Sequence, residues 1–236
     1  MIYGCFHQGS GVGNQLHRYI ATRMLARAKK EGFGMIAPDL FKGASFMKLN
    51  MGASVMDYHV EAHTGRVVPN IELDILDGEF QNSIIWKGMI HWVRDWLKVE
   101  PLHMPDDLCV INFRGGEYKI FPELYLPKEY WDLAVKMMRE TNPDMKFVVH
   151  TDDLEEAKKF FPDFYIVSDI EDNWRSIRYA RYLILSNSSF AILPASIGNA
   201  DRIIAPKYWA RYNTREWINQ DNATYNFEYI HHNETE

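Results

Sequence analysis

Short apolar runs alternate with helix-forming segments between residues 108 and 205, and this alternation limits the fold more than any other feature of the sequence. Apolar runs as short as these are typical of fully buried strands, and the segments between them carry apolar side chains at helical spacing. We expect strands at 108–113, 145–150, 164–167, 182–185 and 202–205, and helices at 127–138, 154–161, 173–181 and 190–198. Strands that alternate with helices form a parallel sheet covered on both faces, so the sequence predicts an α/β fold.

The first part of the chain has a weaker pattern. A short buried strand at 2–6 leads into a glycine-rich turn, a helix that Gly32 can end, and a second strand at 35–37. The segment 83–98 has the spacing of an amphipathic helix, whereas 42–80 has too little periodicity for an assignment. The side chains expected on the buried face of that amphipathic helix are Ile85, Met89, Trp92 and Trp96.

The stretch VEPLHMPDD at 99–107 contains two prolines and interrupts the pattern. A chain of 236 residues fits one large α/β domain or two small ones that share a cleft, and the break at 99–107 favours two. We therefore expect one domain at 1–103 and a second at 104–236. The tail from about residue 209 is rich in aromatic side chains, and we expect it to pack back on the first domain.

Composition removes several classes of function. The net charge is −6 and no lysine- or arginine-rich block exists, which argues against a nucleic-acid partner. Cys5 and Cys109 each lie in an apolar run, which predicts free thiols in a reducing compartment, and so a cytoplasmic protein. No apolar run is long enough to cross a bilayer, and no His/Cys spacing predicts a metal site.

The glycine-rich turn GSGVGNQ, residues 9–15, separates the first strand from the first helix. Glycines at Gly11 and Gly13 allow close approach of an anion, and a helix N-terminus offers unpaired N–H groups. A dinucleotide-binding turn would have glycine at position 14, where this chain has Asn14, although Asp39 follows the second strand as that motif requires. A ligand-free strand-to-helix turn fits the glycines equally well.

Two further polar turns follow predicted strands in the second half. Arg114-Gly115-Gly116-Glu117-Tyr118 places a guanidinium, which suits phosphate, at a strand end, with a surface ion pair to Glu117 as the simpler interpretation. Ser186 to Phe190 precedes a helix and offers hydroxyls there, with a plain helix cap as the alternative. The acidic pairs Asp152-Asp153 and Glu171-Asp172 either cap helices or contact a base or ribose. Polar turns at strand ends in both halves predict a ligand between two domains.

Several segments resemble, in order along the chain, the fucosyltransferases with the two-domain GT-B fold, especially the α-1,2 type of glycosyltransferase family 11. GVGNQLHRYIATRMLA is similar to that family's G-x-G-N-Q opening, FRGGEY to its H-x-R-R-G-D-Y, LSNSSF to its S-N-S-S-F, and RIIAPKYW to its I-A-P-x-x-W. LDGEFQNSIIW is similar to its G-Y-x-Q-S segment, and HTDD to the T-D-D of the superfamily. The resemblance implies two Rossmann-like domains facing a cleft, the first of them reduced, with the acceptor on the first and the nucleotide-sugar on the second.

The resemblance also implies roles for single residues. Asn14 matches an asparagine near the donor's diphosphate, and Arg114 matches the arginine that binds the β-phosphate. Ser188 and Ser189 match hydroxyl residues at the diphosphate, with Phe190 the aromatic residue beside them. Asp172 lies where related enzymes hold guanine, whose N1–H and N2 amine both donate to a carboxylate.

The chain departs from the family's pattern at three positions. Asn112 stands for the histidine, Gly115 for the second arginine and Glu117 for the aspartate. The resemblance still implies an inverting, metal-independent transfer of fucose from GDP-fucose, a donor substrate and not a cofactor, to a glycan hydroxyl. Arg114, Asn14 and Glu117 are the expected catalytic residues, with Glu117 or His7 as candidate bases. A NAD-dependent oxidoreductase built on GSGVG and Asp39, and an inactive nucleotide-sugar- or glycan-binding relative, remain the alternatives.

Overall fold

The structure is a computed structural model that describes residues 1–210, 218–219 and 227–231. The chain folds into two compact units, Met1–Val99 and Glu100–Glu236, and each has its own apolar core. The units part a few residues before the expected boundary at residue 103, within the proline-containing stretch. Their assignment to acceptor and donor stays a prediction.

A six-stranded parallel sheet forms the centre of the second unit, in the order β12-β9-β8-β5-β6-β7. The strands are β5 (Leu108–Phe113), β6 (Lys146–Thr151), β7 (Tyr165–Val167), β8 (Tyr182–Ile184), β9 (Arg202–Pro206) and β12 (Phe227–Ile230). Ile111 of β5 lies between Val149 of β6 and Ile184 of β8, and all three are fully buried. Strands buried on both faces have continuous apolar runs in the sequence. For this reason the expected bounds of β5 to β9 lie close to the observed ones.

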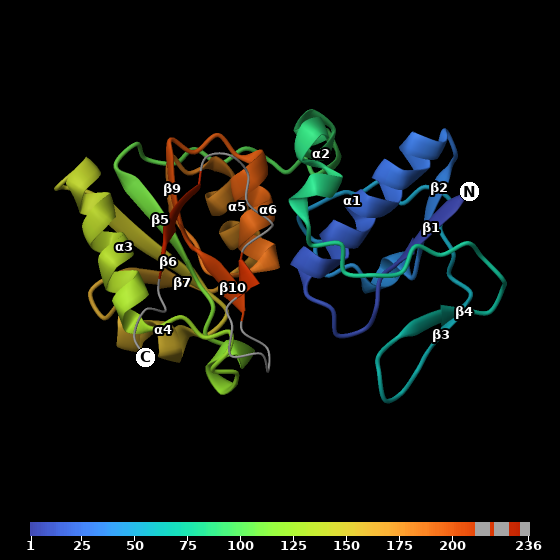
Figure 1. The fold of residues 1–236 in the computed structure, drawn as a ribbon, viewed down its shortest axis with the longest axis horizontal. Helices are drawn as coiled ribbons and strands as arrows, with labels where there is room; N and C mark the ends of the chain where they lie inside the picture. The colour runs from blue at the N-terminus through green and yellow to red at the C-terminus, as the bar shows by residue number, and fades with distance from the viewer. Residues whose placement is uncertain (211–217, 220–226, 232–236) are drawn as a thin grey trace. The chain divides into compact units, whose positions relative to one another are not determined.

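Two helices cover each face of this sheet (Figure 1). The helices α3 (Lys128–Thr141) and α4 (Leu154–Phe160) pack on one face, where they meet alternate strand residues such as Ile111 and Phe113. The helices α5 (Ile170–Tyr179) and α6 (Ser189–Ile197) pack on the other, against Val110 and Leu183. The expected α/β class, with helices on both faces of a parallel sheet, is confirmed for this unit.

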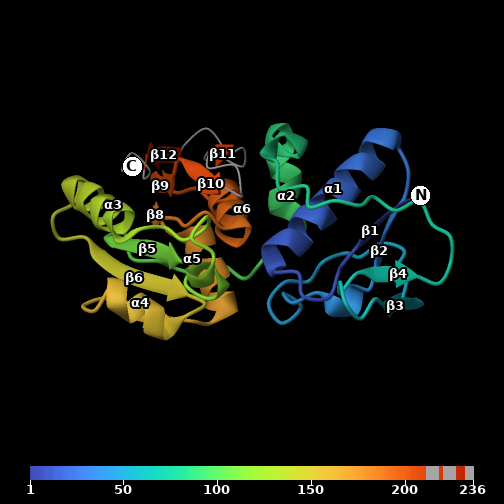
Figure 2. The ribbon, with the colours of Figure 1, turned by 60° about the horizontal axis from the view of Figure 1, so that its bottom comes forward.

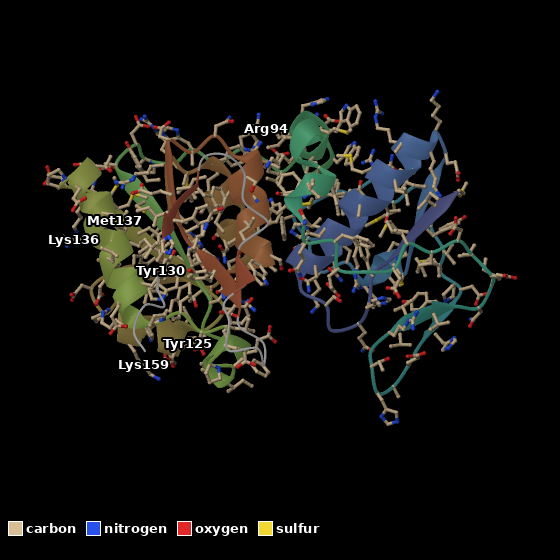
Figure 3. All side chains as sticks on the ribbon, in the orientation of Figure 1. Arg94, Tyr125, Tyr130, Lys136, Met137 and Lys159 are labelled. Carbon is tan, nitrogen blue, oxygen red and sulfur yellow. The ribbon has the colours of Figure 1, made fainter. Side chains whose placement is uncertain are left out.

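The helical spacing of this segment predicts that Tyr130, Leu133, Ala134, Met137 and Met138 share the buried face of α3. Tyr130, Ala134 and Met138 are buried, but Met137 is half-buried, Leu133 is 43% exposed, and Trp131 joins the buried face at 1% exposure. Trp131 reaches the ring of Phe113, 5.3 Å away between centroids, which fixes the rotation of the helix. Figure 3 shows Tyr130 on the side of α3 toward the sheet and Lys136 on the opposite side.

The first unit is built on a smaller sheet. The strands β1 (Ile2–Cys5) and β2 (Phe33–Ile36) are parallel and are connected by α1 (Val12–Lys29), and β3 (Tyr58–Val60) pairs with β4 (Val67–Pro69) as an antiparallel hairpin. The remaining regular segments are α2 (Ile90–Trp96) and the single-turn 3₁₀ helices η1 (Pro38–Leu40), η2 (Ser83–Ile85) and η3 (Lys87–Met89); η4 (Glu117–Ile120) lies in the second unit. The long irregular segments explain the weak sequence pattern.

Two expectations for the first unit are wrong. Lys30, with a left-handed φ of 56°, ends α1, because its N–H and that of Glu31 bond the last carbonyls before Gly32 is reached. The segment 83–98 is two 3₁₀ turns followed by the short α2. The buried apolar side chains there are Trp86, Val93 and Leu97. Of the predicted set, Met89 is 42% exposed and Ile85, Trp92 and Trp96 are half-buried.

The described part of the tail belongs to the second unit, and the expected packing of the tail on the first domain stays a prediction. Phe227–Ile230 forms β12, which pairs in parallel with β9 and extends the sheet of the second unit. The strand β10 (Tyr208–Ala210) pairs with β11 (Ile218–Asn219) in the same unit. The rest of the tail lies outside the described residues.

Candidate functional site

The order of strands in the second unit has one reversal point. From β5 the chain proceeds to β6 and β7 on one side, then returns to β8 on the other side of β5. In open parallel sheets, ligands bind at such a point, outside the carboxyl ends of the two strands. The arrows of β5 and β6 point the same way in Figure 2, as the parallel register requires. The loops that follow β5 and β8 are therefore the candidate site, and they contain Arg114 and Ser188.

Arg114 is the first residue after β5, and its side chain is 26% exposed. Its Nη1 lies 2.6 Å from Oδ2 of Asp152, and its Nη2 lies 3.4 Å from Oε1 of Glu117. The guanidinium also lies 5.0 Å from the centroid of the Tyr118 ring, and its Nε is buried with no hydrogen-bond partner among the described residues. The expected ion pair with Glu117 exists, but Asp152 is the shorter contact.

Asp152 holds the turn after β5 as well as the arginine. Its Oδ1 accepts a 3.0 Å hydrogen bond from the N–H of Gly115. A Cβ at Gly116 would lie 2.3 Å from Oδ2 of Asp152, and a Cβ at Gly115 would lie 2.9 Å from Cβ of Asp153. A side chain at position 115 would therefore collide with the chain that follows β6, and one at position 116 would push the Asp152 carboxylate aside. This packing gives a physical reason for glycine where the resembling family has its second arginine.

The loop after β8 enters α6 with Ser188 at the N-cap. Ser188 is 3% exposed and makes no side-chain capping bond to the helix, while Ser189 and Phe190 follow in the first turn. The ring of Phe190 packs edge-on against Trp174 of α5, 5.5 Å between centroids. The structure thus places Ser188 and Ser189 at the start of a helix and at the end of the strand adjacent to Arg114, whereas Phe190 contributes to packing.

Asn112, which stands where the family has histidine, is buried beneath the site at 1% exposure. The Oγ of Ser186 donates to its Oδ1 over 2.7 Å, and its Nδ2 donates to Oδ1 of Asn173 over 3.3 Å. The Nδ2 of Asn187 donates to the carbonyls of Leu124 and Trp209. These bonds fix the chain at the carboxyl ends of β5 and β8, so the loops start from a rigid base.

Asp172 lies at the first turn of α5, and its side chain is exposed. It lines a depression of about 730 Å³ whose other walls include Leu102, Val148, His150 and Ser176. His150 is 3% exposed, and its Nδ1 makes no hydrogen bond within the described part of the chain. Burial lowers the pKa of His150 to about 4, against the opposing charges of Asp172 and Asp169. The imidazole is therefore neutral at pH 7.

Of the two predicted acidic pairs, only Asp153 caps a helix, and Glu171 forms an ion pair with Arg175 inside α5. Asp153 caps α4 by accepting from the N–H of Glu156, and Asp169 caps α5 by accepting from the N–H of Asp172. This confirms the capping interpretation for Asp153. Asp152 and Asp172 make no such cap: Asp152 pairs with Arg114, and Asp172 lines the depression beside β6. The sequence did not indicate Asp152 as the partner of Arg114, because the two are far apart along the chain.

The glycine-rich turn of the first unit gives α1 an N-cap at Gly11. Gly9 has a φ of +83°, which favours glycine, whereas Gly11 has an ordinary φ of −70° and open space around a would-be Cβ. Gly13 is buried in the first helical turn. The Oδ1 of Asn14 accepts a 2.8 Å bond from Nε2 of Gln81, which joins two segments that the family resemblance singled out.

His7 follows β1, and its hydrogen bonds determine its tautomer. The N–H of Val67 donates to Nδ1 over 3.1 Å, so the proton of the neutral ring sits on Nε2. Burial, and next the charge of Arg18, lower the pKa of His7. A base at this position would need a free lone pair on a ring nitrogen. The lone pair of Nδ1 already accepts the hydrogen bond from Val67, and Nε2 carries the proton. His7 is therefore a hydrogen-bond donor and not a candidate base.

Within the described ranges, no group of three or more His, Cys, Asp or Glu side chains could hold a metal ion. Cys5 and Cys109 are free and buried, and burial raises the pKa of both thiols, to about 12 for Cys5. Among these same residues, no helix combines the length and apolar character that crossing a bilayer requires.

Comparison with known proteins gives matches only at the level of structure, because no family model and no curated protein matches the chain. NodZ α-1,6-fucosyltransferase soaked with GDP-fucose matches with a TM-score of 0.52 and 11% identity over 86% of this chain and 94% of that one. A glycosyl transferase of family 9 from Veillonella parvula matches with a TM-score of 0.51 and 10% identity, over 86% of this chain and 80% of that one. The Escherichia coli heptosyltransferase WaaC with ADP matches with a TM-score of 0.45 and 12% identity, over 90% of this chain and 89% of that one. The first two matches show that the chain is similar in fold to these two glycosyltransferases.

Proposed function

We propose that this protein is a glycosyltransferase that uses a nucleotide-sugar, with GDP-fucose as the donor and a glycan hydroxyl as the acceptor. One observation carries the proposal: Arg114 and the N-terminus of α6 lie at the carboxyl ends of the adjacent strands β5 and β8, at the reversal point of the sheet. Helix N-termini and guanidinium groups are the protein groups that best hold a diphosphate. The fold similarity to a fucosyltransferase that was soaked with GDP-fucose supports this choice of donor.

The proposed reaction inverts the configuration of the sugar. The acceptor oxygen forms a bond to the anomeric carbon as the bond from that carbon to the β-phosphate oxygen breaks, and the electron pair leaves with GDP. The acceptor proton passes to a base, for which Glu117, 67% exposed beside Arg114, is the candidate. Negative charge grows on the β-phosphate, where Arg114 and the α6 amides stabilise it without a metal. Activity is therefore expected to survive EDTA.

Asp152 has a positioning role in this proposal. It keeps the guanidinium of Arg114 in one orientation through Nη1, while Nη2 has only the 3.4 Å contact with exposed Glu117. A diphosphate can replace that weak contact and leave the Asp152 pair intact. Donor binding therefore does not require breaking the stronger ion pair.

The same proposal assigns the depression beside β6 to the guanine. Asp172 offers a carboxylate for N1–H and the N2 amine, and neutral His150 offers a buried nitrogen beside it. Calorimetric titration is expected to show tighter binding of GDP than of UDP, ADP or NAD. Asp172→Asn is expected to reduce this preference, because an amide cannot accept both bonds.

The decisive variant is Arg114→Ala, titrated with GDP. Loss of a hydrogen bond to a charged group predicts about tenfold to hundredfold weaker binding, and a larger loss of turnover. Arg114→Lys should restore binding only in part, because an ammonium lacks the paired geometry. Arg181→Ala is the matched control, since Arg181 also pairs with two carboxylates, Asp106 and Asp201, but precedes β8 at the opposite edge of the sheet. An unchanged GDP affinity in folded Arg114→Ala would refute the proposed site.

Two alternatives make different predictions. A NAD-dependent oxidoreductase would bind NAD more tightly than GDP through the turn at Gly11, with Asp39 at the ribose. Asp39 is exposed and its Oδ2 accepts a 2.7 Å bond from the hydroxyl of Tyr58. An inactive relative would bind GDP but would not hydrolyse GDP-fucose in the absence of acceptor. The shared binding of one diphosphate by Asn14 and Arg114, and membership of family 11, stay predictions.

A further inference from the structure

Residues 100–107, here called the strap, are the first of the second unit and form neither helix nor strand before β5 begins. Proline fixes its own φ and disfavours helix at the residue before it, so Pro101 and Pro105 favour an extended strap. Side chains of an extended chain point alternately to opposite sides. The strap follows this alternation, because Leu102 and Met104 are half-buried whereas Pro101, His103 and Pro105 are exposed.

The two half-buried side chains of the strap face the depression beside β6. Leu102 and Met104 line this depression of about 730 Å³ together with Asp172 and His150. Val148 of β6 adds a further apolar wall, and Met104 packs against the core cluster to which Val148 belongs. A planar ring needs apolar contact on its faces and a few polar groups at its edge. The strap supplies part of the apolar contact that such a ring needs.

Arg175 of α5 holds the first end of the strap. Its Nε donates to the carbonyl of Glu100 over 3.1 Å, and its Nη2 donates to the carbonyl of Pro101 over 3.2 Å. Its Nη1 lies 3.2 Å from Oε1 of Glu171 in the same helix, and the Arg175 side chain is 20% exposed. One guanidinium thus joins α5 to two successive carbonyls, a geometry that the planar fork of arginine allows and a lysine cannot reproduce.

The other end of the strap is held by the backbone. The N–H of Lys146 donates to the carbonyl of Asp107 over 2.9 Å, where β5 and β6 begin to pair. Asp106 adds an ion pair with Arg181, but the Asp106 side chain is 82% exposed, and exposed pairs contribute little. Loss of the Arg175 side chain would therefore release the first end of the strap while the other end stays in place.

We propose that Arg175 is a positioning residue for the ring that binds in this depression. It holds the strap so that Leu102 and Met104 contact one face of the ring while Asp172 meets its edge. This inference rests on the proposed function, in which the ring is the base of the donor nucleotide. Without Arg175 the strap must be ordered when the base binds, and the lost conformational entropy lowers the affinity. The strap is no part of the diphosphate site at Arg114, so a diphosphate without a base binds as before.

The first test is the rate at which dilute hydrogen peroxide oxidises Met104, measured for each methionine by mass spectrometry. Folded Arg175→Ala is expected to oxidise at Met104 about threefold faster than the wild type, because the released strap exposes the thioether. GDP is expected to slow oxidation of Met104 in the wild type. Met56, 59% exposed in the first unit, is the internal reference. Arg181→Ala is the matched control and should keep the wild-type rate, because it removes an arginine contact from the same strap but leaves the backbone bond of Asp107.

The second test is calorimetric titration with GDP and with inorganic pyrophosphate. Arg175→Ala is expected to bind GDP about tenfold more weakly and pyrophosphate as the wild type does. Arg175→Lys should restore GDP affinity only in part, because an ammonium lacks the paired geometry. Leu102→Ala removes part of the wall and keeps Arg175, so it should also weaken GDP binding and leave pyrophosphate binding unchanged.

The inference is overturned if GDP leaves the oxidation of Met104 in the wild type unchanged, or if Arg181→Ala speeds this oxidation as much as Arg175→Ala does. An equal loss of affinity for GDP and pyrophosphate in Arg175→Ala would also overturn it, because a general loss of structure has that effect. The wild type separates this inference from the proposed function. If GDP does not bind the wild type, the proposed function fails and the role of Arg175 fails with it. If GDP binds the wild type and folded Arg175→Ala equally tightly, only the role of Arg175 fails.

Discussion

At the scale of single residues, the turn after β5 depends on the absence of two side chains. Gly115 and Gly116 let Asp152 approach closely enough to bond the backbone N–H of Gly115 and the guanidinium of Arg114 together. A Cβ at position 115 would meet Cβ of Asp153, and a Cβ at position 116 would have to displace the Asp152 carboxylate. The two glycines and the aspartate therefore form one unit, although they belong to different strand ends.

We predict that Gly116→Ala destabilises the protein by about 1–2 kcal/mol, because its Cβ displaces Asp152 and two hydrogen bonds are lost. The comparison variant is Gly88→Ala, where a Cβ meets open space, and a change within about 0.5 kcal/mol is expected. Urea unfolding measures both. In an Asp152→Ala background the cost of Gly116→Ala should largely disappear. Equal costs in the two backgrounds would show that Asp152 is not what the methyl group meets.

At the scale of elements, α1 and α2 are joined by arginine–tryptophan stacking. The guanidinium of Arg27 lies 3.5 Å from the centroid of Trp92, and that of Arg23 lies 4.0 Å from the centroid of Trp96. The two indoles stack on each other at 6.4 Å. The tryptophans that the sequence predicted to line a buried helix face are instead half-buried and covered by cations.

Arg27→Ala is expected to lower the free energy of unfolding by about 0.5–1 kcal/mol through loss of its cation–π contact. Lys29→Ala controls for charge in the last turn of α1, since Lys29 is also exposed there and makes no cation–π contact with an aromatic ring among the described residues. Tryptophan fluorescence during urea unfolding reports both variants. If the two variants lose the same stability, the helix dipole and not the stacking explains the effect of Arg27.

The strands of the second unit were predictable because each is a short apolar run buried on both faces, as Cys109–Phe113 illustrates. The division of the segment 83–98 into 3₁₀ turns and the short helix α2 was not predictable. Its aromatic residues have the same spacing as those of a continuous amphipathic helix. Arg114 and Ser188 were predictable as strand-end residues. The ion pairs of Arg114 with Asp152 and of Arg18 with Glu79 were not predictable, because contacts between distant segments leave no local pattern in the sequence.

At the scale of the whole molecule, burial of histidine ties folding to pH. His150 lies in the sheet of the second unit, where burial lowers its pKa from 6.5 to about 4. Between these two values the unfolded chain binds a proton that the folded chain does not. Stability is therefore full above pH 6.5 and falls as the pH drops toward 4. The pKa of His7 in the first unit is also lowered, so both units respond in the same direction.

This linkage predicts that His150 contributes a slope of at most about 1.4 kcal/mol per pH unit between pH 6.5 and 4. His150→Gln removes the titrating group, so its free energy of unfolding should fall less steeply with acidification than that of the wild type, whatever its stability at pH 7. Guanidinium unfolding followed by circular dichroism at several pH values gives the two slopes. His63→Gln, at an exposed position of the β3–β4 hairpin, should keep the wild-type slope. If the free energy of unfolding falls equally steeply with acidification in wild type and His150→Gln, the ring takes up a proton as readily in the folded protein as in the unfolded chain. His150 would then not be a buried neutral group.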